Sequence, residues 1–212
     1  MTDRLSLYNG ALAVMGERTL ATLTENREPR YKLDDIWGRD FIRTILQKGQ
    51  WNFATRAVRL SFSPSVSPAD WGYKNGFDKP SDWVRVTGIC QDEFFKIPLL
   101  NYSDEGNFLW AELDEIFVRF VSSDSTYGGD FALWSFDFTR YAEHLLAQLS
   151  ARTIMGASFD MTEIDKQTKQ WKKDAKATDS MKEPARFAPP TTWTRSRQQR
   201  RGDRGSRNQL IG

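Results

Sequence analysis

Cysteine and histidine are almost missing from the sequence, which contains one of each, Cys90 and His144. A single cysteine excludes a disulfide within the chain and any zinc site built from several cysteines. A single histidine excludes metal sites and mechanisms that need two histidines from one chain. We expect His144, beside the apolar face of a predicted helix, to have a structural role, and Cys90 to be a small buried side chain.

The motifs of common enzyme classes are also missing. No glycine-rich loop ends in Lys-Ser or Lys-Thr, no GxGxxG follows a predicted strand, and there is no GxSxG. Two pairs of neighbouring acids, Asp34-Asp35 and Asp114-Glu115, resemble candidate carboxylate pairs, but neighbouring residues of a helix point in different directions. We interpret both pairs as surface or interface charge, and we predict no enzymatic activity, no cofactor and no metal ion.

Long apolar runs are a further absence. No segment approaches the roughly 18 uninterrupted apolar residues of a membrane helix. Asn9, Gly10 and Glu17 interrupt the N-terminal segment before the apolar core of a signal peptide develops. We therefore predict neither a signal peptide nor contact with a membrane.

Arginine, by contrast, is concentrated at the C-terminal end. Residues 183–212 contain seven arginines, no lysine and two acids, so their net charge is +5, and the other 182 residues carry −3 of the total of +2. Arginine binds carboxylates and phosphates with two parallel hydrogen bonds. With few apolar side chains, this segment is predicted to be an extended arm that a partner orders. Its predicted contact residues are Phe187, Trp193, Arg195, Arg197, Arg200, Arg201 and Arg204.

Apolar residues recur with helical spacing in two separate parts of the chain. We predict helices from Thr2 or Asp3 to Gly16, over residues 30–48 and 133–155, and from Ser158 or Asp160 to about residue 182. Together, residues 1–50 and 128–182 are expected to form a helical bundle.

Between these parts, residues 51–127 show alternating apolar positions, which are typical of strands. Turn-rich segments separate the strands and favour an antiparallel meander or a small barrel. Predicted strands include Val58–Phe62, Trp83–Ile89, Phe94–Ile97, Phe108–Trp110 and Ile116–Phe120. The predicted fold class is therefore α+β, a helical bundle with an inserted small antiparallel β-domain and an extended C-terminal arm.

Aromatic residues are abundant, with eight tryptophans and fourteen phenylalanines. Aromatic side chains are enriched both in cores and at the buried centres of protein interfaces. We expect some of them to contact other subunits, although a role in the core is equally compatible with each one.

Taken in order, five segments resemble the head-to-tail adaptor proteins of bacteriophages, also called connectors or tail tubular protein A-like proteins. The segments are LYNGALAVMGERTLATLTE, WNFATRAVRLS, KPSDWVRVTGI, FVRFVSSDSTYGGDF and YAEHLLAQLSARTI. The resemblance extends over about residues 3–180, and none of the segments is a catalytic signature.

The resemblance implies a structural virion protein at the head–tail junction, which would be present in the host cytoplasm during assembly. Such adaptors form a ring of about twelve copies beneath the portal protein. Its partners would be the portal protein, other copies of the chain and a tail nozzle or other tail protein, with double-stranded DNA passing through the channel. The arm would reach the portal, although it is more basic than the family pattern requires.

Two alternatives remain open at this point. The arm could bind packaged nucleic acid directly, which would make the chain a nucleic-acid-binding virion protein. A tail-associated cell-wall hydrolase with two carboxylates is the third hypothesis, and no motif supports it.

Overall fold

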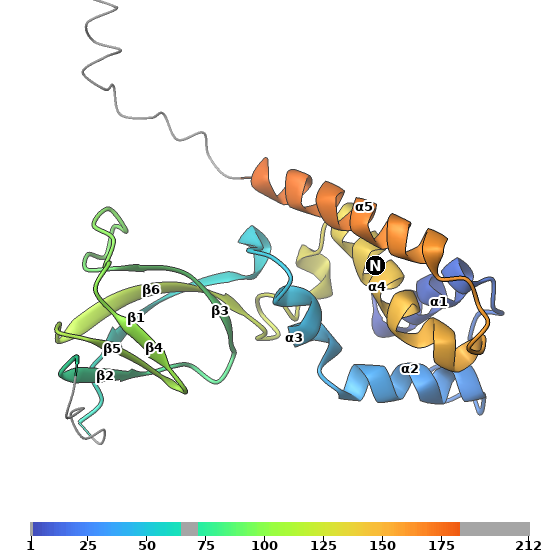
Figure 1. The fold of residues 1–212 in the computed structure, drawn as a ribbon, viewed down its shortest axis with the longest axis horizontal. Helices are drawn as coiled ribbons and strands as arrows, with labels where there is room; N and C mark the ends of the chain where they lie inside the picture. Colours follow the sequence, from blue (N-terminus) through green and yellow to red (C-terminus); the bar gives the residue numbers. More distant parts are fainter. Residues whose placement is uncertain (1, 65–71, 183–212) are drawn as a thin grey trace, which may run out of the picture. The chain divides into compact units, whose positions relative to one another are not determined.

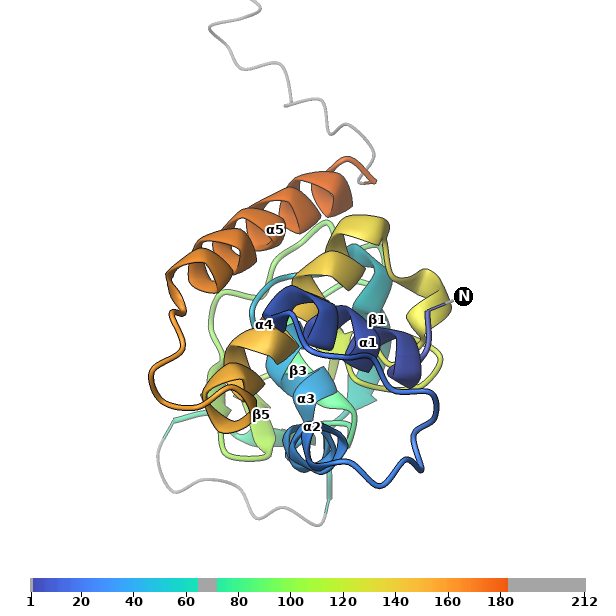
Figure 2. The same ribbon diagram turned by 90° about the vertical axis from the view of Figure 1, so that its right-hand side faces the viewer.

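The computed structural model describes residues 2–64 and 72–182, which belong to one compact unit (Figures 1 and 2). The predicted extended arm, residues 183–212, lies outside the described residues. The helices are α1 (Arg4–Met15), α2 (Glu28–Gly38), α3 (Phe41–Leu46), α4 (Phe136–Ile154) and α5 (Thr162–Ser180), with short 3₁₀ helices η1 (Asn52–Ala54) and η2 (Phe131–Leu133). The strands are β1 (Thr55–Ser61), β2 (Asn75–Asp78), β3 (Trp83–Cys90), β4 (Ser103–Glu105), β5 (Phe108–Ala111) and β6 (Glu115–Ser122). The predicted α+β class is confirmed.

Helix α1 begins and ends where the sequence predicts. The Asp3 carboxylate accepts a hydrogen bond from the Ser6 N–H at 2.7 Å, which satisfies one of the unpaired donors of the first turn. Gly16 ends the helix with a φ of 78°, a left-handed conformation that glycine adopts without steric cost.

The prediction of one helix over residues 30–48 is wrong, because this segment forms the two helices α2 and α3. Pro29 lies in the first turn of α2 and lets it begin at Glu28, earlier than predicted. Asp40 then adopts a φ of 62°, and its carboxylate accepts a hydrogen bond from the Arg43 N–H at the start of α3. Aspartate tolerates this left-handed conformation, so the helix breaks although the apolar spacing continues across the break.

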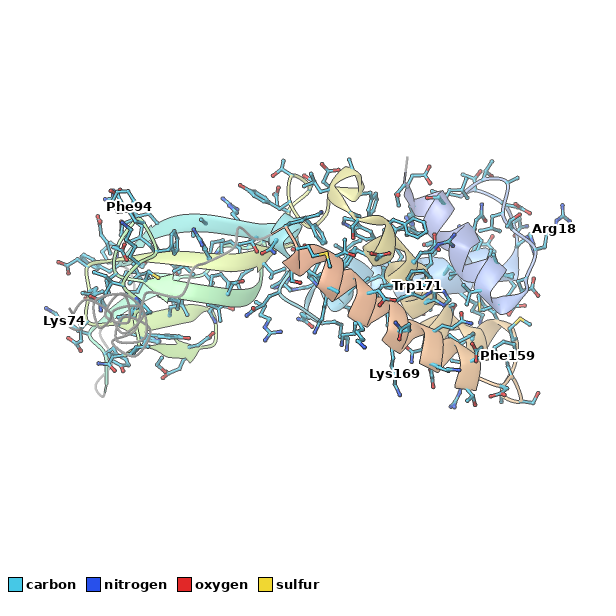
Figure 3. The ribbon with its side chains drawn as sticks, turned by 90° about the horizontal axis from the view of Figure 1, so that it is seen from above. Arg18, Lys74, Phe94, Phe159, Lys169 and Trp171 are labelled. Carbon is cyan, nitrogen blue, oxygen red and sulfur yellow. The ribbon has the colours of Figure 1, made fainter. Side chains whose placement is uncertain are left out.

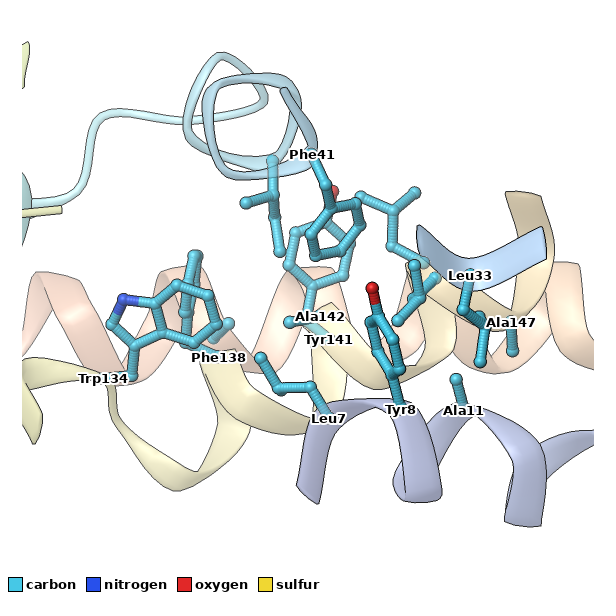
Figure 4. Close-up of a cluster of buried hydrophobic side chains, with 14 of the residues drawn as sticks. Leu7, Tyr8, Ala11, Leu33, Phe41, Trp134, Phe138, Tyr141, Ala142 and Ala147 are labelled. Atoms are coloured by element: carbon cyan, nitrogen blue, oxygen red, sulfur yellow. The ribbon is translucent and has the colours of Figure 1, made fainter. Parts of the chain in front are cut away.

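Helix α4 is the centre of the helical part and contacts α1, α2 and α5 (Figure 2). Its apolar side chains meet those of α1, α2 and α3 in one core, as Figure 4 shows for Phe138, Tyr141 and Ala142. Ser135 caps α4 by accepting a hydrogen bond from the Phe138 N–H, so the helix starts three residues later than predicted. The predicted buried stripe of α5 is confirmed for Ile164, Thr168 and Ala175, while Trp171 is half-buried.

All strand pairs in the described residues are antiparallel, as predicted, and they form two three-stranded sheets. The order β1-β6-β3 places the last strand in the middle of the first sheet, with Thr55 opposite Val121 and Ser61 opposite Glu115. The second sheet has the order β2-β5-β4. Strands that follow one another in the chain are therefore mostly not neighbours, which excludes a simple meander.

The predicted strand Phe94–Ile97 is wrong, because these residues form a tight turn after β3. Phe95 has a φ of 56°, which no strand accommodates. Conversely, β4 and the first two residues of β2 lie within segments whose turn-forming residues predicted loops.

The described tryptophans serve mainly the two cores. Trp51 and Trp134 are buried in the helical core, and Trp83 stacks on Phe120 in the core of the strand region with a centroid distance of 4.6 Å. Trp37, Trp110 and Trp171 are half-buried. Among the described aromatic residues, the exposed ones are instead Tyr31, Phe62, Phe94 and Phe136.

Gly128 lies where the chain returns from β6 to the helices. A Cβ atom at this position would lie 2.4 Å from the carbonyl oxygen of Ser122 and 2.6 Å from Cδ1 of Leu46. The indole N–H of Trp134 donates to the Gly128 carbonyl at 3.0 Å, which fixes this backbone further. Within the described helices, no α-helix is both long and apolar enough to span a membrane.

We predict that Gly128→Ala lowers the free energy of unfolding by about 2 kcal/mol or more, because the backbone at Ser122 has no room to move away. Gly38→Ala is the matched control, since a Cβ there would meet no atom within 4 Å and alanine favours the helix. Urea denaturation of both variants measures the difference. Equal stability of the two variants would contradict this account of the junction.

Candidate contact surfaces

The sequence-predicted site residues all lie outside the described part of the chain. These are Phe187, Trp193, Arg195, Arg197, Arg200, Arg201 and Arg204. The predicted role of the arm therefore stays a prediction, and the surfaces described below were not identified from the sequence.

The end of α5, from which the arm continues in sequence, is attached to two other elements. Asp179 is buried, and its Oδ2 accepts a hydrogen bond from the Asn52 N–H at 2.8 Å. The Asn52 side-chain amide donates in return to the Asp179 carbonyl at 3.0 Å. The hydroxyl of the preceding residue, Thr178, donates to the Asp137 carboxylate in α4. The last turn of α5 is thus held by η1 and α4.

Residues 91–100 form an ordered loop between β3 and β4. The Gln91 N–H donates to the Ile97 carbonyl at 3.0 Å, and the Leu99 N–H donates to the Ile89 carbonyl at 2.9 Å. Inside the turn, the Asp92 carboxylate accepts hydrogen bonds from the N–H groups of Ile97 at 2.7 Å and Lys96 at 3.0 Å. The loop therefore has a defined backbone conformation without support from a partner.

This loop, residues 91–100, presents apolar side chains to solvent. Phe94 is 69% exposed, Ile97 55% and Leu100 82%, and Figure 3 shows Phe94 at the outer end of the strand region. Phe95 turns back instead, and the Arg119 guanidinium lies 4.0 Å from its ring centroid. Neighbouring exposed apolar side chains on a rigid backbone are typical of a protein contact surface.

A second exposed aromatic lies at the start of α4. Phe136 is 67% exposed, and its ring lies against Trp171 of α5 at a centroid distance of 6.2 Å. The Arg140 guanidinium lies 5.4 Å from the same ring, and Leu133 is 41% exposed nearby in the sequence.

The reactive side chains singled out by the sequence are buried. His144 packs within α4, stacked on Trp171 at 6.2 Å, and burial lowers its pKa, with the charge of Arg140 adding to the effect. Cys90 is buried as predicted, and burial raises the pKa of its thiol. Among the described residues, no three His, Cys, Asp or Glu side chains are grouped so that they could hold a metal ion.

The two acidic pairs take part in local pairing. The Asp34 carboxylate accepts from Arg4 at 2.5 Å, Arg30 at 2.6 Å and the Tyr8 hydroxyl at 3.0 Å, which ties α1 to α2. Its neighbour Asp35 pairs with Arg39 at 2.7 Å along the exposed face of α2.

The second pair, Asp114 and Glu115, lies at the start of β6. The Asn75 side chain donates to Asp114 at 3.2 Å, and Arg59 of the neighbouring strand pairs with Glu115. The two carboxylates of each pair thus have different partners and do not face a common site.

Comparison with models of known protein families finds no match, and no curated protein matches the chain significantly.

We predict that acid disorders the loop of residues 91–100. The hydrogen bond from the Ile97 N–H, with that from Lys96, holds the pKa of Asp92 below its ordinary value of 3.8. The carboxylate form therefore stabilises the loop above that value, and the contribution is lost as the pH falls through the lowered pKa.

Hydrogen exchange at the Lys96 and Ile97 amides, corrected for intrinsic rates, should show constant protection from pH 7 to 5 and decreasing protection below about pH 4. Asp92→Asn should remove the pH-dependent step, whereas Asp78→Asn, an exposed aspartate of β2, should leave it. Protection that stays constant to pH 2 in the unmodified protein would be inconsistent with the role given to Asp92.

Proposed function

We propose that this protein is a structural head-to-tail adaptor of a tailed bacteriophage. It would form a ring under the portal, help to retain packaged DNA and provide the attachment platform for the tail. Its partners would be the portal protein, neighbouring copies of the chain and a tail protein, and its place would be the head–tail junction of the virion.

The observation that carries the proposal is the ordered loop of residues 91–100. Phe94, Ile97 and Leu100 are exposed on a loop whose backbone is already held by internal hydrogen bonds. The loop backbone therefore loses little further conformational entropy when a partner binds. An assembly protein needs such preformed contact surfaces, because each copy must bind neighbours that arrive already folded.

The segments that resemble the adaptor family also correspond to framework elements. The first segment spans most of α1, the third contains all of β3 except Cys90, and the fifth lies within α4. Helices α1 and α4 supply much of the helical core, including Leu7 and Tyr141, and β3 contributes Trp83 to the core of the strand region. The resemblance therefore concerns the residues that set the fold, which supports a shared architecture.

The root of the arm supports its proposed role in portal binding. The Asn52–Asp179 hydrogen bonds fix the point at which the chain continues beyond α5. A binding segment that is attached at a fixed point searches a smaller volume, which raises its effective concentration at a nearby binding site.

Nucleic-acid binding through the arm is the alternative function. It depends on the same arginines, all of which lie outside the described residues, so it stays a prediction.

We predict that removal of residues 183–212 abolishes association with the portal protein and leaves the folded unit intact. Light scattering on a sizing column, with the portal protein of the same phage, should show co-elution at one copy per portal subunit for the full chain. The truncated chain should elute alone with an unchanged melting temperature. Portal binding that survives the truncation would contradict the role of the arm.

We also predict that the triple variant Phe94→Ser, Ile97→Ser, Leu100→Ser reduces the mass of the assembly formed on the portal. Each serine removes an exposed apolar contact, so the isolated protein should keep its melting temperature within a few degrees. Tyr31→Ser with Leu149→Ser is the control, because these two exposed apolar residues lie on α2 and α4 instead. If both variants assemble equally with the portal, the loop is not a contact surface.

A further inference from the structure

Helix α5 carries a row of lysines on one side. Lys166, Lys169, Lys173 and Lys176 follow one another at spacings of three, four and three residues. Residues at these spacings lie on the same side of a helix, about 5–6 Å apart from one to the next. Figure 3 shows Lys169 leaving α5 on a different side from Trp171, which packs toward α4.

Two further lysines widen this row into a band. Lys48, just after α3, lines a hollow of about 180 Å³ together with Lys169 and Lys172. Lys166, Lys169 and Lys173 line a neighbouring hollow of about 560 Å³, together with Thr162, Asp165 and Gln170. The lysine band is therefore formed by Lys48, Lys166, Lys169, Lys172, Lys173 and Lys176.

The lysines of the band are not held in ion pairs in the described part of the chain. The nearby acids of α5 have other partners: Asp165 accepts from Gln148 at 2.6 Å, and Asp174 accepts from Gln170 at 2.9 Å. Burial lowers the pKa of Lys172, and the charges of Lys176 and Lys48 add to the effect.

We propose that the lysine band binds the phosphate backbone of double-stranded DNA. Lys166 and Lys176 are ten residues apart, which corresponds to roughly 15 Å along the helix axis. Charges distributed over this length match a linear polyanion, whereas a small anion needs charges that converge on one point. Lysine ammonium groups act as mobile point charges, so the contact would be independent of DNA sequence.

Because the band consists of lysine and not arginine, DNA is a better candidate partner than an acidic protein. Protein interfaces are enriched in arginine and depleted in lysine, because a lysine must give up a strongly held hydration shell. The arm of this chain has seven arginines and no lysine, while α5 has five lysines and no arginine. The two basic segments therefore suit two different partners, and the lysine band suits the better hydrated one.

The test uses the full chain, so that the arm contributes equally to every variant. We expect Lys166→Gln, Lys169→Gln, Lys173→Gln to weaken binding to duplex DNA at least about tenfold at low salt. The slope of log K against log salt should become shallower by about 2 to 3, since each lost phosphate contact changes it by ~0.9. All three lysines are exposed, and glutamine keeps their helix propensity, so the fold is preserved.

The matched control is Arg18→Gln, Lys74→Gln, Lys96→Gln, which removes the same charge from three exposed positions outside α5. Figure 3 shows Arg18 and Lys74 away from α5. Fluorescence anisotropy of a labelled duplex measures both variants. Equal losses in the two variants would overturn the proposal, because total charge would then explain binding. Competition by polyglutamate as effective as that by DNA, per charge, would assign the band to an acidic protein and overturn it as well. Neither readout involves the portal protein, so the result is independent of the proposed adaptor role.

Discussion

Close packing at Gly128 is the constraint on which the arrangement of the described unit depends. At this residue the chain leaves the central strand β6 and returns to the helices, in contact with Leu46, Ala54 and the Ser122 carbonyl. Asp82 reinforces the same region, because its carboxylate accepts hydrogen bonds from Arg56 at 2.8 Å and Ser122 at 2.5 Å. These contacts fix the segment that leads from β6 to α4, and α4 in turn provides the surface on which α1, α2 and α5 pack.

The surfaces of the unit differ in chemistry, and each difference follows from local structure. The loop of residues 91–100 exposes apolar side chains because its backbone hydrogen bonds are satisfied internally. Helix α5 turns its small buried residues toward α4 and leaves its lysines outside. One helix thereby serves two purposes: its apolar stripe completes the core, and its opposite side carries lysines that form no ion pair with any described residue.

The sequence predicts a helix correctly where the apolar residues keep one spacing over the whole element. The stripes of α1, α4 and α5 identify these helices, and Asp3 and Gly16 mark the ends of the first. The prediction fails at single residues with unusual backbone angles: Asp40 divides a helix whose apolar spacing continues, and Phe95 turns a strand-like segment into a loop. The row of lysines was visible in the sequence as a three- and four-residue spacing. Lys48 was not, because its place beside Lys172 depends on how α3 packs.

The hydrogen bonds between Asn52 and Asp179 have a mechanical consequence. Tension applied to the chain beyond Ser180 would pass through the last turn of α5 into Asn52, the first residue of η1, which leads into β1. Because a buried carboxylate and a backbone carbonyl share the load, α5 resists being peeled from its end one residue at a time. The helix would transmit force to the rest of the unit until these two hydrogen bonds break.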